Sequence, residues 1–309
     1  MDLPDLRPEL TRHKILSFLV ARDANLVFEY YQNSKAEQSL TKINSVTKSI
    51  NSALVGICLD RGFIADVNTP IVEYFPSYLV NDADPRKKDI TTFHLLTMSA
   101  GLDWPEFGEW NYFAPMVYSR DIIKFVLGRN LVTNPGAVMN YNSGCSHLLG
   151  AIVQQVTGEK AADFARQVLF EPLGINEFKW HELQGQSLTS DGLKLRPADM
   201  LKFGQLYLNS GCYNGKQLIS ADWIADSTEP YYLTYENIGS YGYQWWVSSV
   251  PTPDGKDIPF YFALGFQGQF IVVVPRLEMV IAITSRLQNT MLPLEIVKSL
   301  IKGQYLSTN

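Results

Sequence analysis

The stretch from Ser45 to Gly62 reads SVTKSINSALVGICLDRG, and it decides how the rest of the chain is interpreted. Its apolar residues recur at the spacing of a helix face, and positions 53–59 are almost wholly apolar. Gly62 is a typical residue for ending a helix. We therefore predict a helix that begins near Ser45, runs to about Leu59 and is directed into the core.

Ser45 and Lys48 lie one turn apart on this predicted helix. Residues three apart share a helix face, so the Lys48 amine can reach the Ser45 hydroxyl and take or relay its proton. Burial disfavours the ammonium form, which makes the free amine available as a base near neutral pH. Amides of a first helical turn lack intrahelical acceptors, so the Ser45 N–H is a candidate oxyanion donor.

The same spacing occurs at Ser39/Lys42 and at Ser299/Lys302, where both residues are expected to face water. For Ser45 and Lys48 an alternative stays open at this point. Ser45 would then be a helix N-cap and Lys48 a side chain that extends its amine to solvent.

Length and composition set broad limits on function. The chain has 309 residues, 46% of them hydrophobic, which is enough for a large core. Its net charge of −5 and the lack of a basic run longer than Arg86-Lys87-Lys88 argue against nucleic acid or a membrane as partner. A small-molecule or peptide-like substrate fits better, and no cofactor is predicted.

The cysteines and histidines predict neither a disulfide framework nor a metal site. Three widely spaced cysteines without a C-x-x-C pair read as buried thiols in a reducing compartment, and the four histidines show no metal-ligand spacing. The first twelve residues have no apolar segment, and no run approaches the length of a membrane span. These patterns predict a cytoplasmic protein.

Strand patterns occur at both ends of the chain. Residues 14–21 and 26–31 predict a hairpin, and residues 260–264, 269–274 and 279–285 predict three more strands. The simplest way to bury their faces is a single antiparallel five-stranded sheet covered by helices. The predicted fold class is therefore α+β.

The middle of the chain is predominantly helical in pattern. Predicted helices are residues 91–98, 119–127, 144–156, 161–169, 197–208 and 292–302. We predict one domain over residues 1–309, with a sheet subdomain at about 1–68 and 181–309 and an inserted helical subdomain at about 69–180.

A third proton-handling group is expected to face the Ser45 helix from the other subdomain. Tyr141 follows the turn Asn134-Pro135-Gly136 and precedes a predicted helix, so a loop can present its phenol there. Packing is the alternative role for this tyrosine.

The order S-x-x-K, then Tyr141 in a Y-x-S/N motif, then a glycine-containing strand motif resembles the serine β-lactamase and penicillin-binding protein superfamily. The resemblance covers most of the chain and is strongest to the β-lactamase-related hydrolases, a branch that includes esterases and nylon-oligomer hydrolases. It rests on residues 45–62, 94–102 (HLLTMSAGL), 141–150, 189–211 (TSDGLKLRPADMLKFGQLYLNSG) and 241–246 (YGYQWW).

The resemblance implies roles for individual residues. Ser45 would be acylated, Lys48 would help to deprotonate it, and Tyr141 would pass the proton to the leaving group and later activate water. Ser143 occupies the place of a substrate-binding asparagine. The sheet-edge motif fits best at Ala263-Leu264-Gly265, with the Phe266 N–H as second oxyanion donor and Gln267 as the next candidate.

One departure from the family pattern bears on substrate choice. Alanine stands at position 263, where the family offers lysine or histidine to a substrate carboxylate. An aromatic cleft suits esters or uncharged amides better than penicillins. Its expected walls are Trp104, Trp110, Tyr112 and Trp245. The alternative is that they pack in the core, which we expect of at least half of them.

Three functions are compatible with these residues. The favoured one is a serine hydrolase that cleaves a carboxylic ester or amide. The second is a β-lactamase or D-alanyl-D-alanine carboxypeptidase on the same fold, and the third is a non-catalytic protein that senses a ligand. A G-x-S-x-G elbow, the mark of an α/β-hydrolase, is absent.

Overall fold

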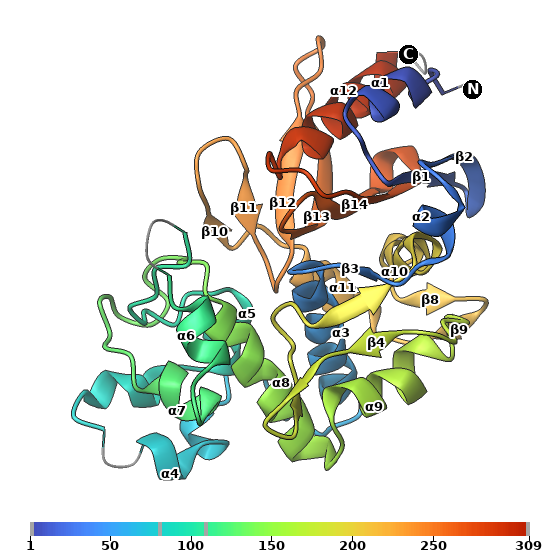
Figure 1. Ribbon diagram of the computed structural model, residues 1–309. Helices are drawn as coiled ribbons and strands as arrows, with labels where there is room; N and C mark the ends of the chain where they lie inside the picture. Colours follow the sequence, from blue (N-terminus) through green and yellow to red (C-terminus); the bar gives the residue numbers. More distant parts are fainter. Residues whose placement is uncertain (1–2, 80–81, 108–110, 307–309) are drawn as a thin grey trace.

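The structure is a computed structural model that describes residues 3–79, 82–107 and 111–306. Its centre is an antiparallel sheet with the strand order β10-β11-β12-β13-β14-β15-β1-β2 (Figure 1). The strands are Ser17–Arg22 (β1), Asn25–Tyr31 (β2), Tyr232–Leu233 (β10), Ser240–Tyr241 (β11), Trp246–Val250 (β12), Ile258–Gly265 (β13), Gln269–Val274 (β14) and Met279–Thr284 (β15). Strand β1 pairs with β15, so the two ends of the chain share one sheet.

The five predicted strands are present as β1, β2, β13, β14 and β15, which confirms the α+β class. The predicted count of five is wrong, because the described sheet has eight strands. Strands β10 and β11 have two residues each, too few for an alternating pattern, and the burial of β12 does not alternate.

Both faces of the sheet are buried, which explains why its central strands are almost continuously apolar. Along β14, Ile271 and Val273 pack in one core cluster, whereas Phe270 and Val272 pack in the other. This alternation follows from the two-residue period of a strand.

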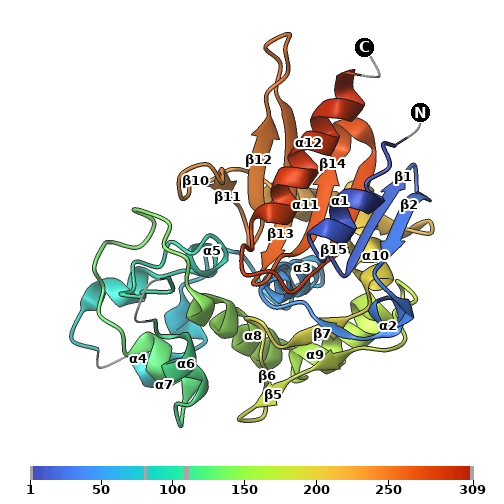
Figure 2. The same ribbon diagram turned by 45° about the horizontal axis from the view of Figure 1, so that its top comes forward.

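Helices cover both faces. Val46–Asp60 (α3) and Pro197–Leu208 (α10) contribute to one cluster, and Arg7–Arg12 (α1) and Leu292–Leu306 (α12) contribute to the other. Both views show α1 and α12 side by side on the same face of the sheet (Figures 1 and 2).

The remaining helices lie mainly beside the sheet, with α8 packed on α3 (Figure 2). They are Ser34–Gln38 (α2), Pro76–Leu79 (α4), Thr92–Leu96 (α5), Phe113–Val117 (α6), Ile122–Leu127 (α7), Ser143–Thr157 (α8), Ala161–Ala165 (α9) and Ala221–Ser227 (α11). Single turns are Ile71–Glu73 (η1), Pro85–Asp89 (η2), Arg166–Phe170 (η3, a π-helix) and Pro275–Leu277 (η4). The predicted subdomain boundaries near residues 69 and 180 stay a prediction.

Three small sheets complete the part of the chain that the structure describes. They pair Thr41–Lys42 (β3) with Leu193–Leu195 (β7), β7 with Lys179–Trp180 (β4), Glu182–Leu183 (β5) with Gln186–Ser187 (β6), and Cys212–Tyr213 (β8) with Lys216–Gln217 (β9). Strand β3 leads directly into the loop before α3, so its pairing with β7 helps to place Ser45.

One buried amide joins three helical segments beneath the site. The Gln244 Nε2 donates to the carbonyls of Leu95 and Leu96 at 3.1 and 3.0 Å, and its Oε1 accepts from Ser146 Oγ at 2.5 Å. Its main-chain carbonyl accepts from Ser49 Oγ at 2.7 Å. Gln244 therefore connects α3, the end of α5 and α8.

Candidate active site

Ser45 and Lys48 lie at the start of α3, as the sequence predicts. Ser45 is the N-cap residue, and its side chain makes no capping hydrogen bond. The Lys48 Nζ donates to Ser45 Oγ at 2.9 Å and to the carbonyl of Ser190 at 2.7 Å. Lys48 is only 1% exposed, so its amine does not extend to solvent.

Burial also changes the protonation of Lys48. The pKa of the amine is lowered from 10.5 to about 8, mainly by its removal from water, and the charge of Lys42 acts in the same direction. The carboxylates of Glu106 and Asp191 act in the opposite direction. About one tenth of Lys48 is therefore uncharged at pH 7, far more than for a lysine with its ordinary pKa.

Tyr141 approaches this pair from the loop before α8. Its ring lies 5.1 Å from Lys48 Nζ, and it stacks between Phe107 and Trp246 at centroid distances of 5.4 and 5.6 Å. Burial raises the pKa of the phenol, and Glu106 raises it further, whereas a hydrogen bond with Ser45 lowers it by less. Tyr141 is thus a neutral phenol beside the Ser45 hydroxyl.

The turn between β13 and β14 lies against the loop that carries Ser45. The amide N–H of Gln267 donates to Thr290 Oγ1 at 3.1 Å. Within the described part of the chain, the N–H groups of Ser45 and Phe266 have no acceptor. Ser45 and Phe266 both line the same cavity.

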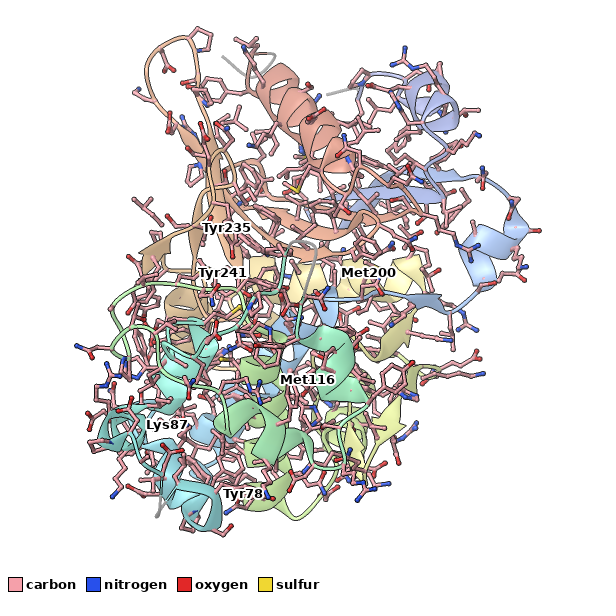
Figure 3. All side chains as sticks on the ribbon, turned by 60° about the vertical axis from the view of Figure 1, so that its left-hand side comes forward. Tyr78, Lys87, Met116, Met200, Tyr235 and Tyr241 are labelled. Carbon is pink, nitrogen blue, oxygen red and sulfur yellow. The ribbon has the colours of Figure 1, made fainter. Side chains whose placement is uncertain are left out.

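This cavity has a volume of about 810 Å³ and opens beside Ser45. Its walls are largely apolar and aromatic, formed among others by Phe107, Phe113, Tyr235, Trp246, Leu264 and Phe266. Figure 3 shows Tyr235 and Tyr241 where the strands of the sheet meet the helices beside it. The size and lining fit an organic substrate of drug-like dimensions.

Glu106 is a carboxylate in the cavity wall that sequence analysis did not identify. It accepts from Ser143 Oγ at 2.6 Å, from the Ser143 amide at 3.1 Å and from Trp104 Nε1 at 2.5 Å. The Ser143 hydroxyl is therefore engaged by Glu106, although Ser143 lines the cavity. Its substrate-binding role stays a prediction.

A second carboxylate, Asp191, lines the same cavity and is 8% exposed. Its Oδ2 forms an ion pair with Lys42 Nζ at 2.6 Å, and its Oδ1 has no partner among the described residues. The described charged residues of the cavity wall are thus Glu106, Asp191 and Lys42.

None of the predicted wall residues that the structure describes, Trp104, Tyr112 and Trp245, lines the cavity. Trp245 is fully buried and packs against Phe203 and Tyr207, so it belongs to the core and not to the cavity. Trp104 is 2% exposed and contacts Tyr112 edge-to-face, so it supports the wall through Glu106 without lining it. Trp110 lies outside the described residues.

On strand β13, Ala263 is buried and Gly265 abuts the loop before Ser45, whereas Leu264 lines the cavity. The strand end therefore offers no cation at position 263, and the side chain that it presents to the cavity, Leu264, is apolar. Within residues 3–79, 82–107 and 111–306, no group of side chains could hold a metal ion.

Comparison with known proteins gives the family. The model of the beta-lactamase family matches residues 11–295. The chain belongs to the beta-lactamase family. This result confirms the resemblance on which the site residues were chosen.

Relatives in the family include named amide hydrolases and esterases. The chain is 24% identical over 307 positions to a 6-aminohexanoate-dimer hydrolase of Paenarthrobacter ureafaciens, a match that covers 90% of this chain and 74% of that protein. It is 29% identical over 156 positions to esterase EstB of Burkholderia gladioli, covering 46% of this chain and 38% of that protein.

A solved structure from Bacillus anthracis, provisionally named a 6-aminohexanoate-dimer hydrolase, has the same fold. It superposes with a TM-score of 0.80 and 24% identity over 98% of this chain and 82% of that one. The family match and the named relatives make the protein a serine hydrolase of the beta-lactamase family.

Proposed function

We propose that the protein cleaves carboxylic esters or amides through an acyl-enzyme on Ser45, with Lys48 and Tyr141 as proton-transfer groups. The observation that carries this proposal is the 2.9 Å contact between Ser45 Oγ and a buried amine whose pKa is about 8. The named relatives, an amide hydrolase and an esterase, support the reaction class.

In the proposed reaction, uncharged Lys48 accepts the Ser45 proton while Oγ attacks the substrate carbonyl carbon. The carbonyl oxygen becomes an oxyanion and accepts hydrogen bonds from the Ser45 and Phe266 amides. Collapse of this intermediate breaks the bond to the leaving group. The leaving group takes a proton from Tyr141, and Lys48 returns a proton to the Tyr141 phenol. Water then attacks the acyl-enzyme, and the protons follow the same path in the opposite direction. Water passes a proton through Tyr141 to Lys48, and Lys48 returns a proton to Ser45 Oγ as the carboxylic acid leaves.

The proposed substrates are uncharged at the group that enters the cavity. Glu106 and Asp191 give the wall two carboxylates, and its lysine, Lys42, is already paired with Asp191. A substrate carboxylate, such as that of a penicillin, would meet repulsion there. This favours neutral esters and amides over the β-lactamase or carboxypeptidase alternative.

Labelling with a fluorophosphonate probe tests the nucleophile. We expect the parent to be labelled and Ser45→Ala not to be, with Ser299→Ala labelled like the parent because its S-x-x-K pair lies on α12. Turnover of a p-nitrophenyl ester should fall about 10²-fold or more in Lys48→Ala and Tyr141→Phe. Equal labelling of Ser45→Ala and parent would refute the proposal, and nitrocefin turnover above ester turnover would favour the β-lactamase.

One further proposal concerns the location of the protein. No helix within the described residues is long and apolar enough to cross a membrane. We propose a cytoplasmic location because the three cysteines are free and two of them are buried.

A further inference from the structure

We infer that Asn44 and Thr290 are positioning residues that clamp the Phe266–Gln267 peptide and thereby hold the Phe266 N–H toward the substrate carbonyl. The inference rests on the proposed acyl-enzyme function. Neither residue belongs to the S-x-x-K, tyrosine or strand motifs of the sequence.

The end of β13 and the loop before Ser45 approach each other closely. A Cβ at Gly265 would lie 2.2 Å from the carbonyl oxygen of Ile43 and 3.3 Å from Asn44 Cβ. Only glycine leaves room for the end of β13 beside the loop before Ser45. Asn44 therefore faces the β13–β14 turn directly.

One peptide of the β13–β14 turn is held on both sides by hydrogen bonds. The Asn44 Nδ2 donates to the Phe266 carbonyl at 2.7 Å, and the Gln267 N–H donates to Thr290 Oγ1 at 3.1 Å. The C=O and N–H of a trans peptide point in opposite directions. The two hydrogen bonds therefore pull on opposite edges of one rigid plane and fix its orientation.

The neighbouring peptide carries the proposed oxyanion donor. The Gly265 carbonyl accepts from the Gly268 N–H at 3.1 Å, which directs this carbonyl into the turn. By the same planarity, the Phe266 N–H points out of the turn. Because Asn44 is the residue before Ser45, its contact with Phe266 also couples the two oxyanion donors to each other.

The backbone of Asn44 determines which variant can test this. Asn44 has φ = 50°, a left-handed conformation that asparagine and glycine adopt readily and alanine does not. Asn44→Gly removes the amide without imposing that strain. Asn214 supplies a matched control, because it is exposed, has φ = 48° and lies between β8 and β9.

The experiment compares Asn44→Gly and Thr290→Val with the parent and with Asn214→Gly. We expect kcat for a p-nitrophenyl ester to fall about tenfold or more in the first two variants, with little change in KM, because a misplaced oxyanion donor weakens binding of the transition state alone. Affinity for an aryl boronic acid, which forms a tetrahedral adduct with the serine hydroxyl, should fall by a similar factor. Unchanged kcat and boronate affinity relative to Asn214→Gly would overturn the inference.

Hydrogen exchange separates the clamp from the proposed function. Loss of either side chain should speed exchange of the Gln267 amide while the melting temperature stays near that of Asn214→Gly. If the parent showed no Ser45-dependent turnover, the proposed function would fail, and the exchange rates would still decide the clamp. Exchange equal to the parent in both variants would refute it.

Discussion

Lys48 illustrates the conflict between stability and chemistry at a single residue. A lysine that is 1% exposed loses the hydration of its charge, and its pKa falls to about 8. The unfolded chain restores an ordinary lysine pKa near 10.5. Below pH 8 both states carry the proton, and the folded state bears the full cost of burying it.

This cost predicts a pH-dependent stability difference between the parent and Lys48→Met. Between pH 8 and 10.5 the unfolded parent binds more protons than the folded parent, so its unfolding free energy rises with pH. The parent should gain up to about 3 kcal/mol relative to the variant across this window. Urea unfolding at pH 7, 8, 9 and 10 measures the difference, with the exposed Lys302→Met as control. A difference independent of pH would contradict the burial of a titrating amine.

Residues of the site differ in how far the sequence reveals them. Ser45 and Lys48 are related by helical spacing, and Tyr141 lies in a loop between a turn and a helix. These local patterns make the three residues candidates, and the resemblance to the family selects them. Glu106 is one of many acidic residues in polar loops, and nothing in its neighbours predicts the three donors that it binds. Its place depends on tertiary packing alone.

At the scale of elements, prediction succeeded where a segment was long enough to show a period. The five strands near the chain ends and helices α3, α8, α10 and α12 all have such a pattern. The predicted helix over 161–169 is confirmed as α9 followed by a π-helical turn. The two-residue strands β10 and β11 contain no period and were missed.

Close packing of α10 on the sheet leads to a prediction about Gly204. A Cβ there would lie 2.4 Å from Val280 Cγ1 and 2.8 Å from Ile271 Cγ2. Alanine gains about 1 kcal/mol of helix propensity, but overpacking a rigid core costs about 1–3 kcal/mol. We therefore expect Gly204→Ala to lower the unfolding free energy.

Gly303 on α12 is the matched control, since a Cβ added there would have no atom of the described residues within 4 Å beyond its own helix backbone and chain neighbours. Gly303→Ala should raise the unfolding free energy by up to about 1 kcal/mol. Urea unfolding of both variants decides between propensity and packing. Stabilisation by both substitutions would show that α10 can move away from the sheet.

At the scale of the whole molecule, the charge of the cavity predicts discrimination between neutral and anionic substrates. We expect p-nitrophenyl valerate to be hydrolysed with a kcat/KM about tenfold or more above that of mono-p-nitrophenyl glutarate, a similar chain that ends in a carboxylate. The ratio should increase in Lys42→Met and decrease at high salt. Equal values for the two esters would contradict the proposed role of Glu106 and Asp191.

The junction at Gln244 limits how the enzyme adapts to substrates of different size. Rotating the sheet away from α5 and α8 would break several buried hydrogen bonds together, because a single side chain and its own carbonyl make all of them. Adjustment of the entrance is then left to the exposed rings of Phe107, Tyr235 and Phe266, of which Phe107 also stacks on Tyr141. Substitution of these rim residues should therefore change the range of acyl groups that the enzyme accepts, while the hydrogen bonds of Gln244 stay in place.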